Sequence, residues 1–173
     1  YLANIADYYY AVMHFVIVIG VLVWLYVKRP LFYRSARTVL YATNAVAAIG
    51  FWLYPLTPPR LLADQGFIDT LVKYHTWGSL ASGGVSKISN QYAAMPSLHI
   101  GWSLWAGLCV FALAKRWWVR AIALAYPVAT FFVIVGTANH YVLDAVGGVV
   151  ALTLGFLIQR LLTGHAVNQL PEP

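Results

Sequence analysis

Five apolar stretches alternate with polar or proline-containing segments along the chain. They cover residues 8–27, 38–55, 98–114, 119–137 and 141–162. A helix that crosses a bilayer needs about 20 apolar residues, with roughly 17–25 accepted, so each stretch is long enough to be a membrane span. Pro30 and Pro55 mark ends of the first two stretches, because proline disfavours helix in the residue before it. The pattern predicts an all-α, polytopic helical bundle that forms a single domain over residues 1–173.

The only long connection between these stretches is the polar segment 56–96. It contains Pro58-Pro59 and Gly83-Gly84, which are typical of loops. A short helix is expected within it near residues 67–74.

The composition supports a membrane protein. Hydrophobic residues make up 61% of the chain and charged residues only 9%, whereas a soluble domain carries about 25% charged residues. The net charge of +6 is compatible with nucleic-acid binding, but the basic residues lie at the ends of apolar stretches and form no basic helix face. We therefore expect the bilayer, and no nucleic acid, as a partner. The single cysteine, Cys109, excludes an internal disulfide and a cysteine-based metal site.

The basic residues also predict an orientation, because cytoplasmic loops hold an excess of lysine and arginine. Eight of the eleven fall on one side of the predicted spans: Lys28, Arg29, Arg34, Arg37, Lys115, Arg116, Arg120 and Arg160. The other three lie in the long loop. This loop and Tyr1 are therefore expected to be extracytoplasmic. Five spans with an outside start predict one further helix upstream, and so a six-helix core.

Two histidines lie where predicted spans begin on the extracytoplasmic side. Ser97 is placed as a helix N-cap with His99 in the first turn, and Asn139 and His140 open the last span in the same way. Helix N-termini favour anions such as phosphate through their free N–H groups and positive dipole ends. The pattern therefore indicates a phosphate site at this face.

His140 and Asp144 are four residues apart, so they share a helix face and the carboxylate can accept the imidazole Nδ1–H. This bond leaves Nε2 as a nucleophile. Asp144 is also the only acidic residue inside a predicted span, and such residues are usually functional. Two alternatives stay open from the residues alone. His99 could simply bond a carbonyl at its helix start, and His140 with Asp144 could be an ion pair that locks packed helices.

The segment AMPSLH at residues 94–99, followed by HYVLD at residues 140–144, resembles the type 2 phosphatidic acid phosphatase superfamily. Within it, the second motif is most similar to the inositol phosphorylceramide synthase branch and its bacterial relatives. The resemblance implies a six-helix membrane bundle in a bacterial plasma membrane that acts on a lipid phosphate or phospholipid. It also implies that His140 attacks phosphorus, that Asp144 orients His140, and that His99 protonates the leaving oxygen. No metal or other cofactor is expected.

The chain departs from the phosphatase branch at the residues that bind phosphate. That branch carries lysine seven residues before an Arg-Pro pair, where this chain has Leu53 and Arg60-Leu61, and it carries Ser-Arg where this chain has Val133-Ile134. These departures favour the synthase branch.

The candidates for holding phosphate are therefore other polar residues of the outer face: Arg60, Lys87, Ser97 and Asn139. Arg60 is the first choice because guanidinium binds phosphate in a bidentate way. As an alternative, Arg60 could be an interfacial arginine whose head reaches water, and Asn139 could be a helix cap.

Water as acceptor would make the protein a lipid phosphatase, and a sugar or inositol hydroxyl would make it a transferase that moves a headgroup such as inositol phosphate. The sequence leaves both open, together with the oligomeric state. Two other classes compete. One is a haem-binding bundle with His14, His99 and His140 as axial ligands. The other is a proton-coupled transporter that uses Asp144 and the histidines as a relay. For His14 itself, a core histidine and a substrate contact are both compatible with its position.

Overall fold

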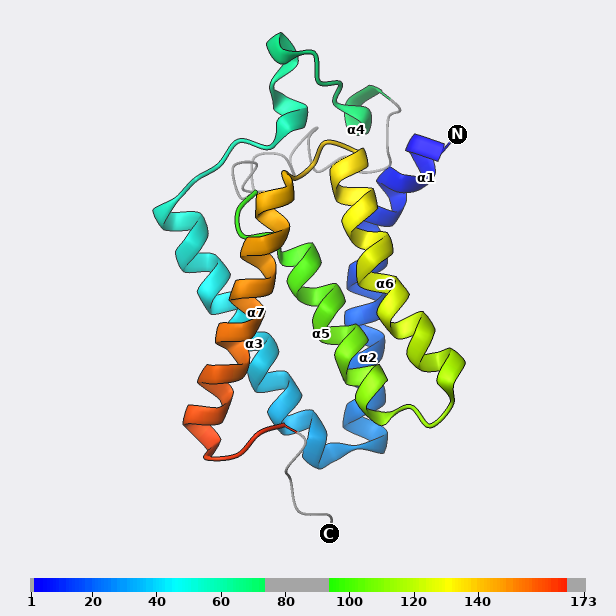
Figure 1. Cartoon of the computed structure of the whole chain (residues 1–173), viewed down its shortest axis with the longest axis vertical. Helices are drawn as coiled ribbons and strands as arrows, with labels where there is room; N and C mark the ends of the chain where they lie inside the picture. The colour runs from blue at the N-terminus through cyan, green and yellow to red at the C-terminus, as the bar shows by residue number, and fades with distance from the viewer. Residues whose placement is uncertain (1, 74–93, 168–173) are drawn as a thin grey trace.

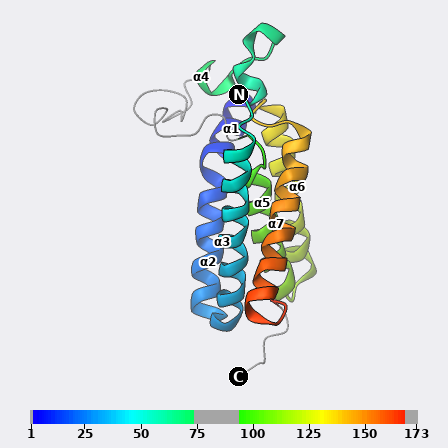
Figure 2. The same ribbon diagram turned by 90° about the vertical axis from the view of Figure 1, so that its left-hand side faces the viewer.

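The computed structural model of the chain describes residues 2–73 and 94–167, and within them it is a bundle of long helices (Figure 1). The elements, in chain order, are α1 Leu2–Tyr8, a π-helical turn Tyr9–Met13, α2 His14–Lys28, α3 Pro30–Leu53, two 3-10 turns Pro59–Leu61 and Ala63–Gln65, α4 Thr70–Lys73, α5 Leu98–Leu113, α6 Trp117–Gly136 and α7 Val142–Thr163. The long helices stand side by side in both views (Figures 1 and 2). The prediction of an all-α bundle is confirmed.

Helices long and apolar enough to cross a membrane include Leu2–Lys28, Trp117–Gly136 and Val142–Thr163. α5 is a shorter apolar helix of 16 residues, and α3 has 24 residues but carries Arg34 and Arg37 in its first half. The outer faces of the bundle expose large apolar side chains, among them Trp52, Phe132 and Leu161 at 81%, 67% and 84% exposure. Apolar surface of this extent needs a lipid environment. The chain is an integral membrane protein.

The junction between the first two predicted spans is shorter than the sequence pattern suggested. α2 ends at Lys28, as expected, but α3 begins at Pro30 and not near residue 38. Proline is favoured at the first position of a helix, where its fixed φ fits and its missing N–H costs no hydrogen bond. Arg34 and Arg37 therefore lie on the helix and not in a loop.

α5 is the central helix and contacts α2, α3, α6 and α7. Its Trp105 is fully buried and donates its indole N–H to the Ala36 carbonyl at 2.8 Å. α3 and α7 approach closely at Gly155, where an added Cβ would lie 2.9 Å from the Val39 carbonyl oxygen. Small residues at such crossings are typical of membrane bundles, since they allow close backbone contact.

The N-terminal ends of α5 and α7 are held together at the end of the bundle that also carries α1 and α4 (Figure 1). The Ser97 N–H donates to the Asp144 carbonyl at 2.9 Å. One turn further along α7, a Cβ added to Gly148 would overlap the Ser97 carbonyl oxygen. This close contact fixes the start of α5, and with it His99, beside the first turn of α7.

Candidate active site

His140 is held through one of its two ring nitrogens. Its Nδ1 lies 2.9 Å from the Ala94 carbonyl oxygen and 3.3 Å from Asp144 Oδ2. Both partners only accept hydrogen bonds when Asp144 is ionised, so Nδ1 carries the proton and neutral His140 keeps a lone pair on Nε2. The His140 side chain is buried at 5% exposure. A lone pair held in this way can act as a nucleophile.

The structure brings His99, 41 residues away in sequence, to this free nitrogen. His99 Nδ1 lies 3.4 Å from His140 Nε2, and the two rings are inclined at 62° with centroids 5.4 Å apart. Since His140 Nε2 is the acceptor in this tautomer, the bond between the rings requires a proton on His99 Nδ1. The pair therefore combines a nucleophilic nitrogen with an N–H donor beside it.

Asp144 has two partners for one oxygen atom. Its Oδ2 accepts the Tyr141 N–H at 2.8 Å, which caps the start of α7, and also contacts His140 Nδ1. Its Oδ1 has no hydrogen-bond partner among the described residues. The carboxylate is fully buried. It can both orient the His140 ring and stabilise a positive charge on that ring.

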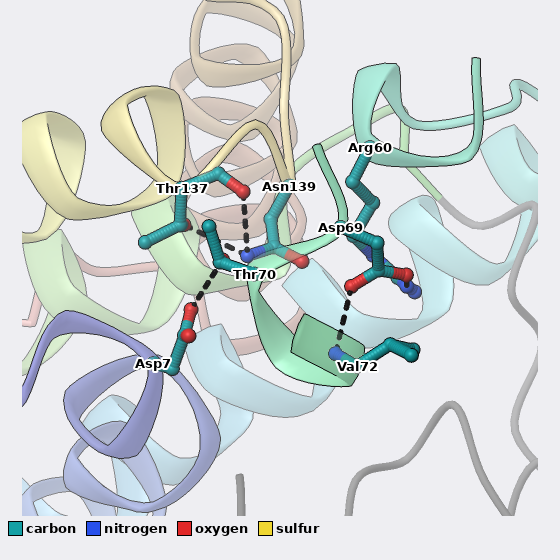
Figure 3. Close-up of polar contacts among 7 residues, drawn as sticks. All are labelled: Asp7, Arg60, Asp69, Thr70, Val72, Thr137 and Asn139. Carbon is teal, nitrogen blue, oxygen red and sulfur yellow. Dashed lines mark hydrogen bonds and ion pairs between the residues drawn. The ribbon is translucent and has the colours of Figure 1, made fainter. Parts of the chain in front are cut away.

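Arg60 is anchored next to the turn that precedes His140, because its backbone N–H donates to the Ala138 carbonyl at 2.8 Å. Its guanidinium forms an ion pair with Asp69, with Nη1 to Oδ2 at 2.7 Å, and its Nε has no partner in the described part of the chain. Arg60 is only 8% exposed, so the sequence-based alternative of a water-reaching interfacial arginine does not fit. Figure 3 shows Arg60 and Asp69 together at this end of the bundle. Sequence reasoning missed Asp69.

The other predicted phosphate ligands differ in what they can offer. Ser97 is fully buried, and its hydroxyl has no partner within the described residues. Asn139 uses its Nδ2 to donate to Thr137 Oγ1 at 2.8 Å, which leaves Oδ1 as the atom without a described partner (Figure 3). Its Nδ2 also points to the Thr137 carbonyl at 3.5 Å. Because both amide hydrogens face Thr137 and a carbonyl oxygen cannot donate, the Asn139 side chain offers phosphate no free donor in this arrangement. Lys87 lies outside the described residues.

Two aromatic residues of the first long helix complete the surroundings of His99. Tyr10 stacks on the His99 ring with centroids 4.3 Å apart, and His14 meets it edge-on at 4.4 Å. His14 is 5% exposed and its Nδ1 has no partner among the described residues. The sequence feature that could have indicated these contacts is the four-residue spacing of Tyr10 and His14, which places both residues on one helix face.

The geometry does not favour a haem held between His99 and His140. Imidazole nitrogens bind metals at roughly 2 Å, so two ligands on opposite sides of one iron would stand about 4 Å apart with the porphyrin between them. The facing nitrogens of His99 and His140 are already 3.4 Å apart. This contact leaves no space for such a group between the two rings.

A family model described as the PAP2 superfamily matches residues 1–158, which includes every described residue of this site. The chain belongs to the PAP2 superfamily. The resemblance to type 2 phosphatidic acid phosphatases is thereby confirmed.

The chain is also similar to a curated relative, the phosphoinositol dihydroceramide synthase of Bacteroides thetaiotaomicron. The two are 24% identical over 155 residues, which cover 82% of this chain and 50% of the relative. This PAP2 chain thus spans about half the length of that relative. No solved structure matched the chain.

Proposed function

We propose that this PAP2 protein is a membrane lipid phosphatase or phosphotransferase that works through a phosphohistidine on His140. The observation that carries the proposal is the pair of acceptors on His140 Nδ1, the Ala94 carbonyl and Asp144. They leave Nε2 as the nucleophilic atom, 3.4 Å from His99. Family membership independently supports chemistry on a lipid phosphate.

In the first half-reaction, His140 Nε2 attacks the phosphorus of the substrate. The N–P bond forms while the bond from phosphorus to the leaving oxygen breaks, and that oxygen takes a proton from His99, which enters this step as an imidazolium and leaves it neutral. The phosphorylated imidazole ring, still protonated at Nδ1, gains positive charge. Asp144 stabilises this charge because its carboxylate lies beside Nδ1.

In the second half-reaction, His99 acts as a base. It takes the proton of the acceptor hydroxyl, whose oxygen attacks phosphorus as the N–P bond breaks. His140 then returns to its neutral form and His99 is again an imidazolium. Both histidines end the cycle as they began, and the pathway as proposed uses no metal or other cofactor.

The phosphate is bound by donors around the starts of α5 and α7. Arg60 Nε and the Ser97 hydroxyl are buried donors without described partners, and the helix N-termini add their dipoles. Lys87 is proposed as a further phosphate ligand on the basis of the sequence alone.

The acceptor decides between hydrolysis and transfer. The name of the relative, phosphoinositol dihydroceramide synthase, favours an alcohol acceptor and transfer of a headgroup such as inositol phosphate. A panel of lipid phosphates and phospholipids, assayed with and without inositol and long-chain alcohols, tests the proposal. Phosphate release or transfer that disappears in His140→Ala is expected. Full activity in His140→Ala would overturn it.

The site faces the extracytoplasmic side of a bacterial plasma membrane in this proposal, because the segments that carry the eight basic residues lie at the opposite end of the bundle (Figure 1). These segments are the end of α2, the first half of α3, the connection from α5 into the first turn of α6, and the end of α7. Cysteine in place of the exposed Asp64 should react with an impermeant maleimide in whole cells, whereas cysteine in place of the exposed Arg116 should not. The native Cys109 is buried and gives little background. The reverse labelling pattern would contradict this orientation.

A further inference from the structure

The ion pair between Arg60 and Asp69 affects what the site can bind, because it already neutralises the guanidinium. The two groups meet at 2.7 Å with exposures of only 8% and 18%. Charges this far from water are weakly screened, so they act strongly on a bound anion nearby.

Asp69 is held in place by contacts that do not involve Arg60. Its Oδ1 accepts the Val72 N–H at 3.3 Å, in the first turn of α4. The next residue, Thr70, donates its hydroxyl to Asp7 of α1 at 2.8 Å. Figure 3 shows these contacts side by side, with Asp69 between α4 and Arg60. The negative charge of Asp69 is therefore a fixed part of the site.

The charged groups at this end of the bundle include Arg60 and the carboxylates of Asp69 and Asp144. Asp69 offsets Arg60, and Asp144 lies beside His140. Arg60 still has an Nε–H without a described partner, and Ser97 has a hydroxyl. Around Arg60, the described residues thus offer hydrogen bonds to a phosphate oxygen but no excess positive charge.

We propose that Asp69 is a specificity-determining residue that favours singly charged phosphodiesters over doubly charged phosphomonoesters. This inference rests on the proposed function, since it assumes that phosphate binds beside Arg60. A phosphomonoester carries about −1.5 to −2 charges at pH 7, whereas a diester carries one. The unfavourable Coulomb energy between Asp69 and a bound monoester is therefore about twice that for a diester.

The test compares two substrates with the same leaving group: bis(para-nitrophenyl) phosphate, a diester, and para-nitrophenyl phosphate, a monoester. Asp69→Asn removes the charge and keeps an oxygen that can cap α4, because asparagine is as good an N-cap as aspartate. We expect kcat/KM for the diester to rise by about tenfold and that for the monoester by about a hundredfold, since the Coulomb gain scales with ligand charge. The monoester-to-diester ratio should rise by about tenfold, which corresponds to about 1.4 kcal/mol.

Asp64→Asn is the matched control. It makes the same chemical change and the same change in net charge at an exposed aspartate in the same loop. The ratio should stay at the parental value in this variant. A rise equal to that in Asp69→Asn would show a general charge effect and overturn the assignment.

Two further variants extend the test, and the first of them keeps it decisive if Asp69→Asn does not fold. Arg60→Gln leaves Asp69 unbalanced and should lower the ratio by about tenfold. Arg60→Gln combined with Asp69→Asn restores neutrality and should return the ratio close to the parental value, although both rates fall. Lower melting temperatures with an unchanged ratio in every folded variant would mean that the pair is only structural.

Failure of this inference and failure of the proposed function give different results. A parent protein that releases no nitrophenolate from either substrate contradicts the proposed function. The proposed role of Asp69 is then contradicted as well. A parent that reacts through His140 but shows the same ratio after Asp69→Asn contradicts only the role of Asp69.

Discussion

Asp144→Asn separates the two roles of this carboxylate, which caps the start of α7 and places a negative charge beside His140. Asparagine can still accept the Tyr141 N–H that caps α7. The Ala94 carbonyl, at 2.9 Å, still accepts from His140 Nδ1 and preserves the tautomer. The substitution therefore removes mainly the negative charge that stabilises a positively charged His140 ring.

The size of this effect follows from the geometry. Unit charges at the 3.3 Å separation of Nδ1 and Oδ2 interact by about 5 kcal/mol at an effective dielectric constant of about 20. The ring spreads its charge over several atoms, so a mean separation of about 5 Å and about 3 kcal/mol are more realistic. At about 1.4 kcal/mol per decade of rate, phosphoenzyme formation should slow by on the order of 10²-fold.

The assay is the quenched-flow burst of nitrophenolate from bis(para-nitrophenyl) phosphate, with the melting temperature measured alongside. Asp144→Asn should form the phosphoenzyme about a hundredfold more slowly than the parent, measured as the rate of the first nitrophenolate released per folded enzyme. Asp64→Asn is the control for loss of one negative charge. If Asp144→Asn reaches its burst within a few-fold of the parental rate, the carboxylate is only a helix cap and the electrostatic argument is refuted.

Two other predictions address phosphate binding and helix packing. Arg60→Ala should reduce kcat/KM more than Arg60→Lys, because lysine keeps the charge but loses the planar fork; equal kcat/KM in both variants and the parent would remove Arg60 from the site. Gly155→Ala should lower the melting temperature, because the added Cβ would meet the Val39 carbonyl at 2.9 Å. Such overpacking lowers the free energy of unfolding by about 1–3 kcal/mol. Gly20→Ala has open space within 4 Å and is the control; equal melting temperatures for the two glycine variants would contradict the close packing of α3 and α7.

The features that could be predicted from sequence are those that local spacing determines. The long apolar stretches correctly predicted the long helices, and the four-residue spacing of His140 and Asp144 correctly predicted their contact. The prediction that both lie on one helix face was wrong, because α7 begins at Val142 and His140 lies in the turn before it. The start of α3 could not be found in this way, because Pro30 is compatible with both the end of one helix and the start of the next. Hydropathy then assigned the polar first turns of α3 to a loop.

Other features of the site depend on contacts between distant segments. The Ala94 carbonyl reaches His140 only because of the path of the chain before α5. Asp69 pairs with Arg60 because the loop folds back between them. Helix packing buries His14 against His99, with an Nδ1 that has no partner among the described residues. No spacing rule specifies such contacts, so sequence reasoning identified the catalytic candidates but not the residues that tune them.

The most direct test of the account is to identify the residue that carries the covalent intermediate. The protein is mixed with bis(para-nitrophenyl) phosphate, quenched in base within the burst phase, and mapped by peptide mass spectrometry. We predict a nitrophenylphosphoryl group on His140 in the parent and in His99→Ala, where the good leaving group needs little protonation. No adduct should form in His140→Ala. An adduct on any residue other than His140, or an unchanged burst in His140→Ala, would contradict the assignment of His140 as the nucleophile.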